Sequence, residues 1–492
     1  MKYDFSKIFL LTAAVLTLCA FGALRAETRL WPLPADEDAN ADWTVKINGE
    51  TADVVNAYTA QAPFEGYDFG GDYGFVSVDT DEPITLEFTT KQDLSHLEIR
   101  PASLGLTPEV NAEAGTVTVK VDRPCRFSIE PNGIERPVLV FVNPLETNIP
   151  KEDDANTLFF GPGIHRVEGN NVKLTEGQTL YLAPGAILKA SVSVAGDNVA
   201  ILGRGIIDSN EWEWLGIPGD GFALYIGSSR NVTVDGIILR GASHWTVRTQ
   251  NSENITINNI KLCGSRIQND DGIDPCNTRH LTVTNSFLRT DDDCVAIKEM
   301  KESDGDCSDL LFEKCVFWTD RARVVLIGHE CHGPSIKDVI FRDCDIIHAR
   351  ERYFLIENGE EMLVENILFE NIRVQTDASH QLPKPLEEMN VDTRNVRLEI
   401  DKEEPITWLL RARPVINMYM RKAVPAVIRD VTLRDITITG PETYCGILLN
   451  GMDEEYNVDG VTFENCDFFG NPLSEDSPRV TIGKYVENVT FK

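Results

Sequence analysis

The chain has 492 residues, which is long enough for a large core and for more than one domain. Its composition is that of an ordinary soluble protein and indicates neither a disordered nor a fibrous one. The formal charge of −32 makes nucleic acid a poor partner, because phosphate binding needs a basic surface, and it disfavours adhesion to anionic membranes. A polysaccharide bound in one local groove is compatible with this charge.

Residues 1–26 have the pattern of a secretory signal peptide. Lys2 and Lys7 precede an apolar run that ends at Leu18, and small residues follow it. Cys19 stands where a lipoprotein cysteine would, but Leu18 before it is bulkier than lipoprotein cleavage tolerates. No later apolar run is long enough to cross a bilayer. We therefore expect an exported protein, periplasmic or extracellular, without a membrane span.

Residues 27–150 predict a small β-sandwich. They hold short alternating runs such as "WTVKINGE", "ITLEFTT" and "VTVKVDRP", separated by Pro, Gly and Asp. Evenly spaced strands with such turns are typical of two packed antiparallel sheets. We expect this domain to cap the open end of the structure that follows and to cover its edge.

Residues 151–492 predict a solenoid. A short pattern recurs there, as in "NVTVDGIIL", "NITINNIKL" and "HLTVTNSFL", with a period of about 23 to 30 residues. Each unit alternates apolar and polar residues, turns at an Asn, Asp or Gly pair and alternates again, which indicates half-buried strands. Strand units of fixed period stack on one another. The sequence therefore predicts an all-β protein with a right-handed parallel β-helix.

One interval, roughly residues 376–428, is about twice as long as the period. Insertions in solenoids map to one face, which is often the binding face. This insertion either forms a wall of the groove or is a tolerated excursion of the chain.

The cysteines that follow Cys19 are scattered along the sequence, and several lie inside strand-like runs. An exported protein permits disulfides, but no Cys pair or Cys/His cluster with zinc spacing is present. We expect buried free thiols.

Two aspartate-rich segments, "NDDGIDPCN" and "TDDDCVAIK", lie about one repeat apart. In a parallel β-helix, positions one repeat apart stack at a spacing of roughly 4.8 Å. Asp271, Asp274, Asp292 and Asp293 would then converge on one outer face. Carboxylates held so close push their pKa values apart and leave a protonated acid beside an ionised base, which is what glycoside hydrolysis requires.

A purely structural role for these aspartates is the alternative. Asp-rich turns in β-solenoids cap backbone N–H groups, and "ESDGDCSD" at Glu302–Asp309 has the composition of a loose calcium loop. A single Asp pair would favour this structural role. Two carboxylate clusters one repeat apart favour the catalytic one.

The two segments together resemble the Asn-Thr-Asp-Gly-Ile-Asp and Gly-Asp-Asp-Cys-Ile-Ala-Ile-Lys signatures of the polygalacturonases, glycoside hydrolase family 28. "LTEGQTLYLAPGAILKAS", "NVAILGRGIID" and "VVLIGHECHGPSIKDVIFRDCDI" are also similar to bacterial members of that family. The likeness covers roughly residues 155–370. It implies a right-handed parallel β-helix and hydrolysis of a polysaccharide.

The resemblance also implies roles for individual residues. Asp292 corresponds to the general acid, and Asp271 and Asp293 correspond to the pair that activates water on the opposite face. This arrangement implies single displacement with inversion, for which the carboxyl groups stand roughly 6.5–9.5 Å apart. Lys298 corresponds to the lysine of the "AIK" motif, where it either binds a substrate hydroxyl or carboxylate or is a solvated lysine at a strand end. Lys298 and Asp274 are candidates for contact with the substrate.

The chain departs from the family pattern around these aspartates. Asp270 replaces a threonine and Asp291 replaces a glycine, which makes the site more acidic. Ala322 stands where the family has the histidine of Gly-His-Gly. His329 is nearby but out of register, and it either substitutes for that histidine or is structural.

The Arg-Ile-Lys motif that binds the galacturonate carboxylate in the family is also missing. Arginine is well suited to a carboxylate, so nearby arginines are candidates for binding an acidic sugar. They are equally consistent with surface charges that balance the acidic residues. These residues are Arg321, Arg323, Arg350 and Arg352.

The chain also resembles the dextranases and isopullulanases of glycoside hydrolase family 49. Those proteins place a β-sandwich ahead of a parallel β-helix, use three aspartates, and act on neutral α-glucans that need no carboxylate grip. Trp245 and Trp318 are either platforms for sugar rings or packing residues.

Two further classes are open. A polysaccharide lyase would use the clustered aspartates as calcium ligands and Lys298 or Arg323 as the base. A non-catalytic β-helix would bind a glycan without cleaving it. The paired motifs favour a hydrolase that cleaves an α-linked polysaccharide or oligosaccharide with inversion. We expect it to be a monomer and to need no metal or other cofactor.

Overall fold

The structure is a computed structural model that describes residues 27–59, 70–350, 352–358, 361–377, 407–416, 424–443 and 445–492. The predicted signal peptide lies outside the described residues, as does most of the predicted insertion at 376–428. Within the described residues, no helix has the length and apolarity to cross a membrane.

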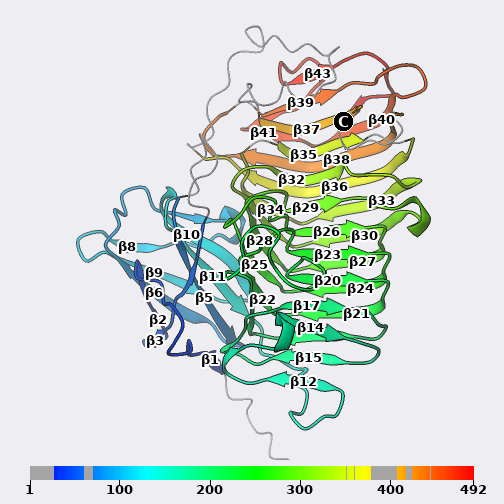
Figure 1. Cartoon of the computed structure of the whole chain (residues 1–492). Helices are drawn as coiled ribbons and strands as arrows, with labels where there is room; N and C mark the ends of the chain where they lie inside the picture. Colours follow the sequence, from blue (N-terminus) through cyan, green and yellow to red (C-terminus); the bar gives the residue numbers. More distant parts are fainter. Residues whose placement is uncertain are drawn as a thin grey trace, which may run out of the picture.

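Two largely antiparallel sheets form the N-terminal part, drawn in blue and cyan in Figure 1. Their facing side chains, such as Val45 and Phe88 from one sheet and Phe127 and Val140 from the other, share one apolar core, so the predicted β-sandwich is confirmed. One sheet contains β1 (Thr28–Leu30), β4 (Val55–Ala57), β5 (Tyr73–Thr80), β7 (Glu98–Arg100), β10 (Cys125–Ile134) and β11 (Val138–Asn143). The other contains β2 (Trp43–Ile47), β3 (Glu50–Ala52), β6 (Ile84–Thr90), β8 (Glu109–Asn111) and β9 (Thr116–Val121).

The chain from β12 onwards winds into a parallel β-helix, which confirms the predicted fold (Figure 1). Most turns contribute three short strands, and each strand pairs in parallel with its counterpart one turn later. The strands thus form three strips along the helix.

The first strip contains β12 (Thr157–Phe160), β15 (Thr179–Leu182), β18 (Ala200–Gly203), β21 (Arg230–Asp235), β24 (Glu253–Asn258), β27 (Arg279–Thr284), β30 (Cys307–Glu313), β33 (Ser335–Arg342), β36 (Leu363–Gln375), β38 (Val427–Thr439) and β40 (Val458–Glu464). The second contains β13 (Gly163–His165), β16 (Ala186–Leu188), β19 (Ile206–Asp208), β22 (Ile238–Arg240), β25 (Lys261–Cys263), β28 (Phe287–Thr290), β31 (Val316–Thr319) and β34 (Asp345–His348). The third contains β14 (Asn171–Leu174), β17 (Ser191–Val194), β20 (Leu224–Gly227), β23 (Val247–Gln250), β26 (Ile273–Cys276), β29 (Val295–Ile297), β32 (Arg323–Gly328), β35 (Arg352–Asn358), β37 (Thr407–Pro414), β39 (Cys445–Leu449) and β43 (Val480–Ile482).

Inward side chains of successive turns stack into one continuous apolar core. Val232, Ile255 and Leu281 are register partners on three successive turns, and all are buried. The ten cysteines among the described residues are free and buried, as the sequence predicts.

The Asn and Asp residues of the repeat sit at corners of the solenoid. Asn231 and Asn254 adopt left-handed φ angles of 56° and 57°, which Asn tolerates better than most residues. Asn254 Nδ2 donates a hydrogen bond to Asn231 Oδ1 over 3.3 Å, and Asn231 Nδ2 donates to Asn198 Oδ1 over 3.0 Å. The corner therefore needs a residue that both turns the chain and pairs with the turn below, which explains the pattern in the sequence.

The β-sandwich packs along the side of the β-helix and does not cap its open end, so that expectation is wrong (Figure 1). Outward positions of the second strip carry an apolar side chain on turn after turn, beside buried charged side chains such as Arg240 and Arg289. The apolar stripe would face water without a cover. Tyr73, Phe75 and Phe141 of the sandwich cover it, and the Tyr73 hydroxyl donates to Gly264 O over 3.0 Å. The covered side chains are Ile187, Ile206, Ile238, Cys263, Phe287, Val316, Trp318 and Ile347.

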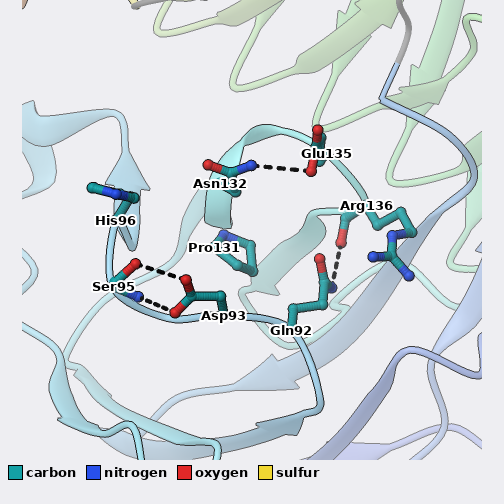
Figure 2. A pocket seen from close by; sticks show the side chains of 8 residues that line it. All are labelled: Gln92, Asp93, Ser95, His96, Pro131, Asn132, Glu135 and Arg136. Carbon is teal, nitrogen blue, oxygen red and sulfur yellow. Dashed lines mark hydrogen bonds between the residues drawn. The ribbon is translucent and has the colours of Figure 1, made fainter.

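A cavity of about 250 Å³ lies within the N-terminal part (Figure 2). Apart from Pro131 its lining side chains are polar, and two of them bond within the lining. Gln92 Nε2 donates to the backbone carbonyl of Arg136 over 3.0 Å, and Asn132 Nδ2 donates to Glu135 Oε2 over 3.0 Å. The predicted catalytic aspartates do not line it and lie on the β-helix instead. The lining residues are Gln92, Asp93, Ser95, His96, Pro131, Asn132, Glu135 and Arg136.

Candidate active site

Three aspartates meet on the third strip of the β-helix. Asp271 precedes β26, and Asp292 and Asp293 precede β29 on the next turn. The two strands pair in parallel, and Gly272 N–H donates to Asp293 O over 2.8 Å. One oxygen of each carboxylate lies within 4.8 Å of the others, and all three residues are buried. The fold therefore brings together the residues that the sequence selects as catalytic.

These oxygens are closer than the roughly 6.5–9.5 Å expected between the carboxyl groups of an inverting site. The reason is geometric, because two of the carboxylates belong to consecutive residues and the third lies one turn away, at a rise of roughly 4.8 Å. The 4.8 Å joins only the nearest oxygens, and the spacing of the carboxyl groups themselves stays a prediction.

Two arginines from the next turn cover the cluster. Arg321 donates from Nε to Asp291 Oδ1 over 3.0 Å, and from Nη2 to Asp291 Oδ2 over 2.7 Å and Asp292 Oδ2 over 2.8 Å. Arg323 donates from Nη2 to Asp293 Oδ2 over 2.8 Å. The sequence left open whether these arginines are surface charges or sugar ligands. They are ion-pair partners of the site carboxylates, and Asp291 orients Arg321.

The place of the expected histidine is occupied differently. Ala322, which stands between Arg321 and Arg323 in the sequence, is buried and has no polar side chain. The guanidinium groups of its two neighbours contact the carboxylates at this turn. His329 stands at the end of β32 with its ring Nε2 4.0 Å from Glu357 Oε2, and burial lowers the pKa of this histidine. His329 therefore faces Glu357 on β35 of the following turn.

Lys298 is the cation that contacts Asp271. Its Nζ is 3.4 Å from Asp271 Oδ2, 3.2 Å from Asp274 Oδ1 and 3.5 Å from Glu330 Oε2. Burial alone would lower the pKa of Lys298, but Asp274, Glu330 and Asp271 raise it well above its ordinary value. Lys298 is therefore a fixed cation within the site.

The three carboxylates have different electrostatic environments. Burial raises the pKa of Asp292, but Arg323, Arg321 and Lys298 outweigh burial and hold it below its ordinary value. Burial raises the pKa of Asp293 to about 7 in spite of Arg323. Burial and the neighbouring Asp274 raise the pKa of Asp271 well above its ordinary value, and Asp271 Oδ1 is buried without a hydrogen-bond partner among the described residues. One ionised and one protonated carboxyl can thus coexist here.

Asp270 has a structural role. Its Oδ2 accepts the backbone N–H of Ser265 over 2.6 Å, and its Oδ1 accepts that of Asp291 over 2.5 Å. The carboxylate thus ties the loop before Asp271 to the segment that carries Asp292. Asp270, which stands where the family has a threonine, therefore stabilises the loops that carry the site through hydrogen bonds to the backbone and is not itself a catalytic group.

Trp318 is not a sugar platform, and this prediction is wrong. The side chain is fully buried under the β-sandwich, with its indole N–H donating to Asp320 Oδ1 over 2.7 Å. Arg352 is also buried, and it is the register partner of Arg323. Burial raises the pKa of Glu357, but Arg411, His329 and Arg352, in decreasing order of effect, outweigh burial and hold it below its ordinary value.

An aromatic cluster, of which the sequence singled out only Trp245, lies on the two turns before Asp271. The rings of Phe222 and Trp245 stack at 5.9 Å, and those of His244 and Trp245 stack at 5.1 Å. Arg248 and Lys298 lie over the Trp245 ring, so Trp245 supports cations and its face is covered. Counting one repeat backwards from Asp271 would have found this cluster.

The three aspartates also have the geometry of a cation site. Each of them already faces a protein cation: Arg321 for Asp292, Arg323 for Asp293 and Lys298 for Asp271. A divalent ion would have to displace or repel these groups.

Known proteins match parts of this arrangement. Residues 188–380, which include the whole carboxylate cluster, match the family model described as Glycosyl hydrolases family 28. The "Putative galacturan 1,4-alpha-galacturonidase C" of Aspergillus niger is 29% identical over 127 residues, which cover 22% of this chain and 30% of that protein. The "Probable exopolygalacturonase B" of Aspergillus terreus is 23% identical over 289 residues, which cover 50% of this chain and 62% of that protein. The chain thus spans less than two thirds of the length of either relative.

The solved structure of Dex49A from Penicillium minioluteum is similar over nearly the whole chain. Its TM-score is 0.63 at 12% identity, with 95% of this chain and 96% of that chain covered. At this identity the likeness shows a shared fold. The resemblance to glycoside hydrolase family 28 is therefore confirmed in the β-helix, and the fold resembles that of the family 49 protein Dex49A over nearly all of the chain.

Proposed function

We propose that this chain is an exported glycoside hydrolase that cleaves α-glycosidic bonds of an acidic polysaccharide of the polygalacturonate type, or of its oligosaccharides, with inversion. The observation that carries the proposal is the meeting of Asp271, Asp292 and Asp293 within 4.8 Å on one strip of a β-helix. Export is proposed from the pattern of residues 1–26.

The charges around the cluster support an acidic substrate. Lys298, Arg321 and Arg323 surround the three aspartates, and a further arginine, Arg248, lies over Trp245. The first three cations are paired with the aspartates, so the cation that favours a negatively charged ligand at this place is Arg248. A neutral α-glucan is the second candidate, supported by the fold shared with Dex49A over nearly the whole chain.

The assignment of acid and base has two forms. The family resemblance makes Asp292 the general acid and Asp271 with Asp293 the water-activating pair. The unliganded geometry favours Asp271 as the proton carrier. Asp271 is buried, its pKa is raised, and among the described residues its ion-pair partner is Lys298 and not an arginine. Asp292, in contrast, is held ionised by Arg323 and Arg321. Substrate binding would have to shift Arg321 for the first form to apply.

A leaving-group experiment separates these forms. An α-galacturonide with an activated aryl leaving group needs little protonation, so a variant that lacks the acid keeps most of its activity on it. We expect either Asp271→Ala or Asp292→Ala to be rescued in this way, and the rescued position is the acid. Proton NMR of the first anomer released tests inversion, and a retained anomer would contradict the proposed displacement.

Hydrolysis itself is tested by reducing-sugar release from polygalacturonate and dextran in parallel, with absorbance followed near 235 nm as the signature of a lyase product. We expect reducing ends from polygalacturonate without absorbance, and no loss of rate with a chelator. Release from dextran alone would support the neutral glucan. A lyase is disfavoured because Lys298 is protonated among three carboxylates and Arg323 is paired with Asp293.

A further inference from the structure

We infer that Arg248 binds the carboxylate of an acidic sugar next to the catalytic aspartates and so determines substrate specificity. This inference rests on the proposed function and names a residue outside the motifs that suggested it. It starts from the missing Arg-Ile-Lys motif, because a uronate substrate still needs a cation to recognise it.

The arginines of the following turns are already engaged. Arg321 bridges Asp291 and Asp292, and Arg323 bonds to Asp293. A guanidinium that neutralises a protein carboxylate offers little net charge to a second one. Recognition of the substrate charge therefore has to come from another turn.

Arg248 has the position that this role needs. It lies on β23 and is the register partner of Asp274 on β26, whose carboxylate contacts Lys298 over 3.2 Å. Arg248 and Lys298 both lie over the Trp245 ring, at 5.4 Å and 3.6 Å from its centroid. The two cations thus share one platform beside the catalytic cluster.

The contacts of Arg248 leave its charge available. Its Nη2 donates over 2.7 Å to Gln250 Oε1, a neutral acceptor, and its Cζ lies 5.0 Å from the centroid of the Phe222 ring. Among the described residues its Nε is buried without a hydrogen-bond partner. Burial raises the pKa of Asp274, which Lys298 and, less strongly, Arg248 oppose, and that carboxylate is held by Lys298 over 3.2 Å. The side chain is partly exposed. A stacked, partly exposed guanidinium whose neighbouring carboxylate is already paired with a lysine is suited to a ligand carboxylate.

The test uses the full-length protein with Arg248→Gln, on polygalacturonate and on its methyl-esterified form. We expect KM for polygalacturonate to rise roughly 10- to 100-fold, as for loss of a charged hydrogen bond, while kcat changes by no more than a few-fold. On the methyl-esterified substrate, wild type and variant should have equal KM. Arg230→Gln, a change of the same charge at an exposed arginine on β21, is the control and should leave both KM values unchanged.

The outcomes separate the two proposals. If the wild type cleaves polygalacturonate and Arg248→Gln leaves its KM unchanged, or raises KM equally on both substrates, Arg248 does not read the carboxylate. If the wild type cleaves only a neutral glucan, the proposed substrate class is wrong, and this inference falls with it. Arg248→Lys should restore part of the lost affinity, which a merely structural role in packing on Trp245 would not require.

Discussion

Two buried clusters of charge in this molecule differ in how completely their polar atoms are bonded. In the candidate site, Asp271 Oδ1 and Asp274 Oδ2 are buried and have no hydrogen-bond partner in the part of the chain that the structure describes. The second cluster joins the β-sandwich to the β-helix, and it is centred on His348 of β34 with Glu130 of β10 and Asp377.

In the second cluster every charged group is paired. His348 Nε2 lies 2.9 Å from Glu130 Oε2, and His348 Nδ1 bonds to Asp377 Oδ2. Glu130 also faces Arg100 Nε over 3.4 Å. A complete network of this kind stabilises a structure, whereas unmet acceptors destabilise it and are retained where they serve a ligand or a reaction. We therefore interpret the first cluster as functional and the second as structural.

The largest expected effect is on catalysis. Asp292→Asn removes a charge from the candidate site with little change of shape, and we expect kcat/KM to fall by roughly 10³-fold or more. Asp270→Asn is the matched control, because the Asp270 carboxylate accepts backbone N–H groups. The control should lower Tm and keep measurable activity. An Asp292→Asn variant within tenfold of the wild-type rate would exclude a catalytic role for this residue.

The second cluster should respond in the opposite way. Glu130→Gln leaves His348 and Arg100 without their shared counter-ion, which should cost about 3–5 kcal/mol of unfolding free energy. Thermal and urea unfolding measure this loss. At a temperature where the variant is folded, kcat/KM should stay within a few-fold of wild type. A variant of unchanged stability would show that the network is not structural.

The pH dependence of stability should reveal the same cluster. Burial lowers the pKa of His348, but Glu130 and Asp377 outweigh it and raise the pKa to about 9. The stability from the charged imidazole is therefore fully present below about pH 6.5 and is lost as the pH rises through about 9. Wild-type Tm should fall between pH 7 and pH 10, and His348→Gln should show a smaller fall over that interval.

The smallest effect is a gain. Burial raises the pKa of Asp293 to about 7, so folding favours the neutral carboxyl, and its contribution to stability is lost as the pH rises from about 3.8 through about 7. Asp293→Asn mimics the neutral form and should raise Tm at pH 8 by about 2–4 °C. The difference should vanish near pH 4. A lower Tm at pH 8 would instead assign Asp293 to the stabilising pairs.

The fold could be predicted because its determinants are local. Each turn repeats the alternation of a half-buried strand and a corner such as Asn231 or Asn254, so periodicity alone indicates a solenoid. One period also relates Asp271 to Asp293, which explains why the sequence identifies the carboxylate cluster.

The errors concern features that periodicity does not encode. Trp318 alternates as an outward residue, and only the placement of the β-sandwich shows that this outward face is covered. The partners of Arg321 and Arg323 depend on side-chain conformation, not on position in the repeat. The sequence did not identify Arg248, because its candidate role depends on two spatial neighbours. It shares the Trp245 ring with Lys298, and Lys298 belongs to a later turn.

The contact between Tyr73 and Gly264 has a consequence for how this protein can be recombined. Gly264 begins the loop that contains Ser265 and Asp270, and Asp270 ties this loop to Asp291 on the next turn. The sandwich thus contacts the backbone that positions the candidate site. The sandwich is therefore not an independent module. A chimera that carries the sandwich of another protein would need a tyrosine at the position of Tyr73 and apolar side chains that fit the β-helix stripe to keep its activity.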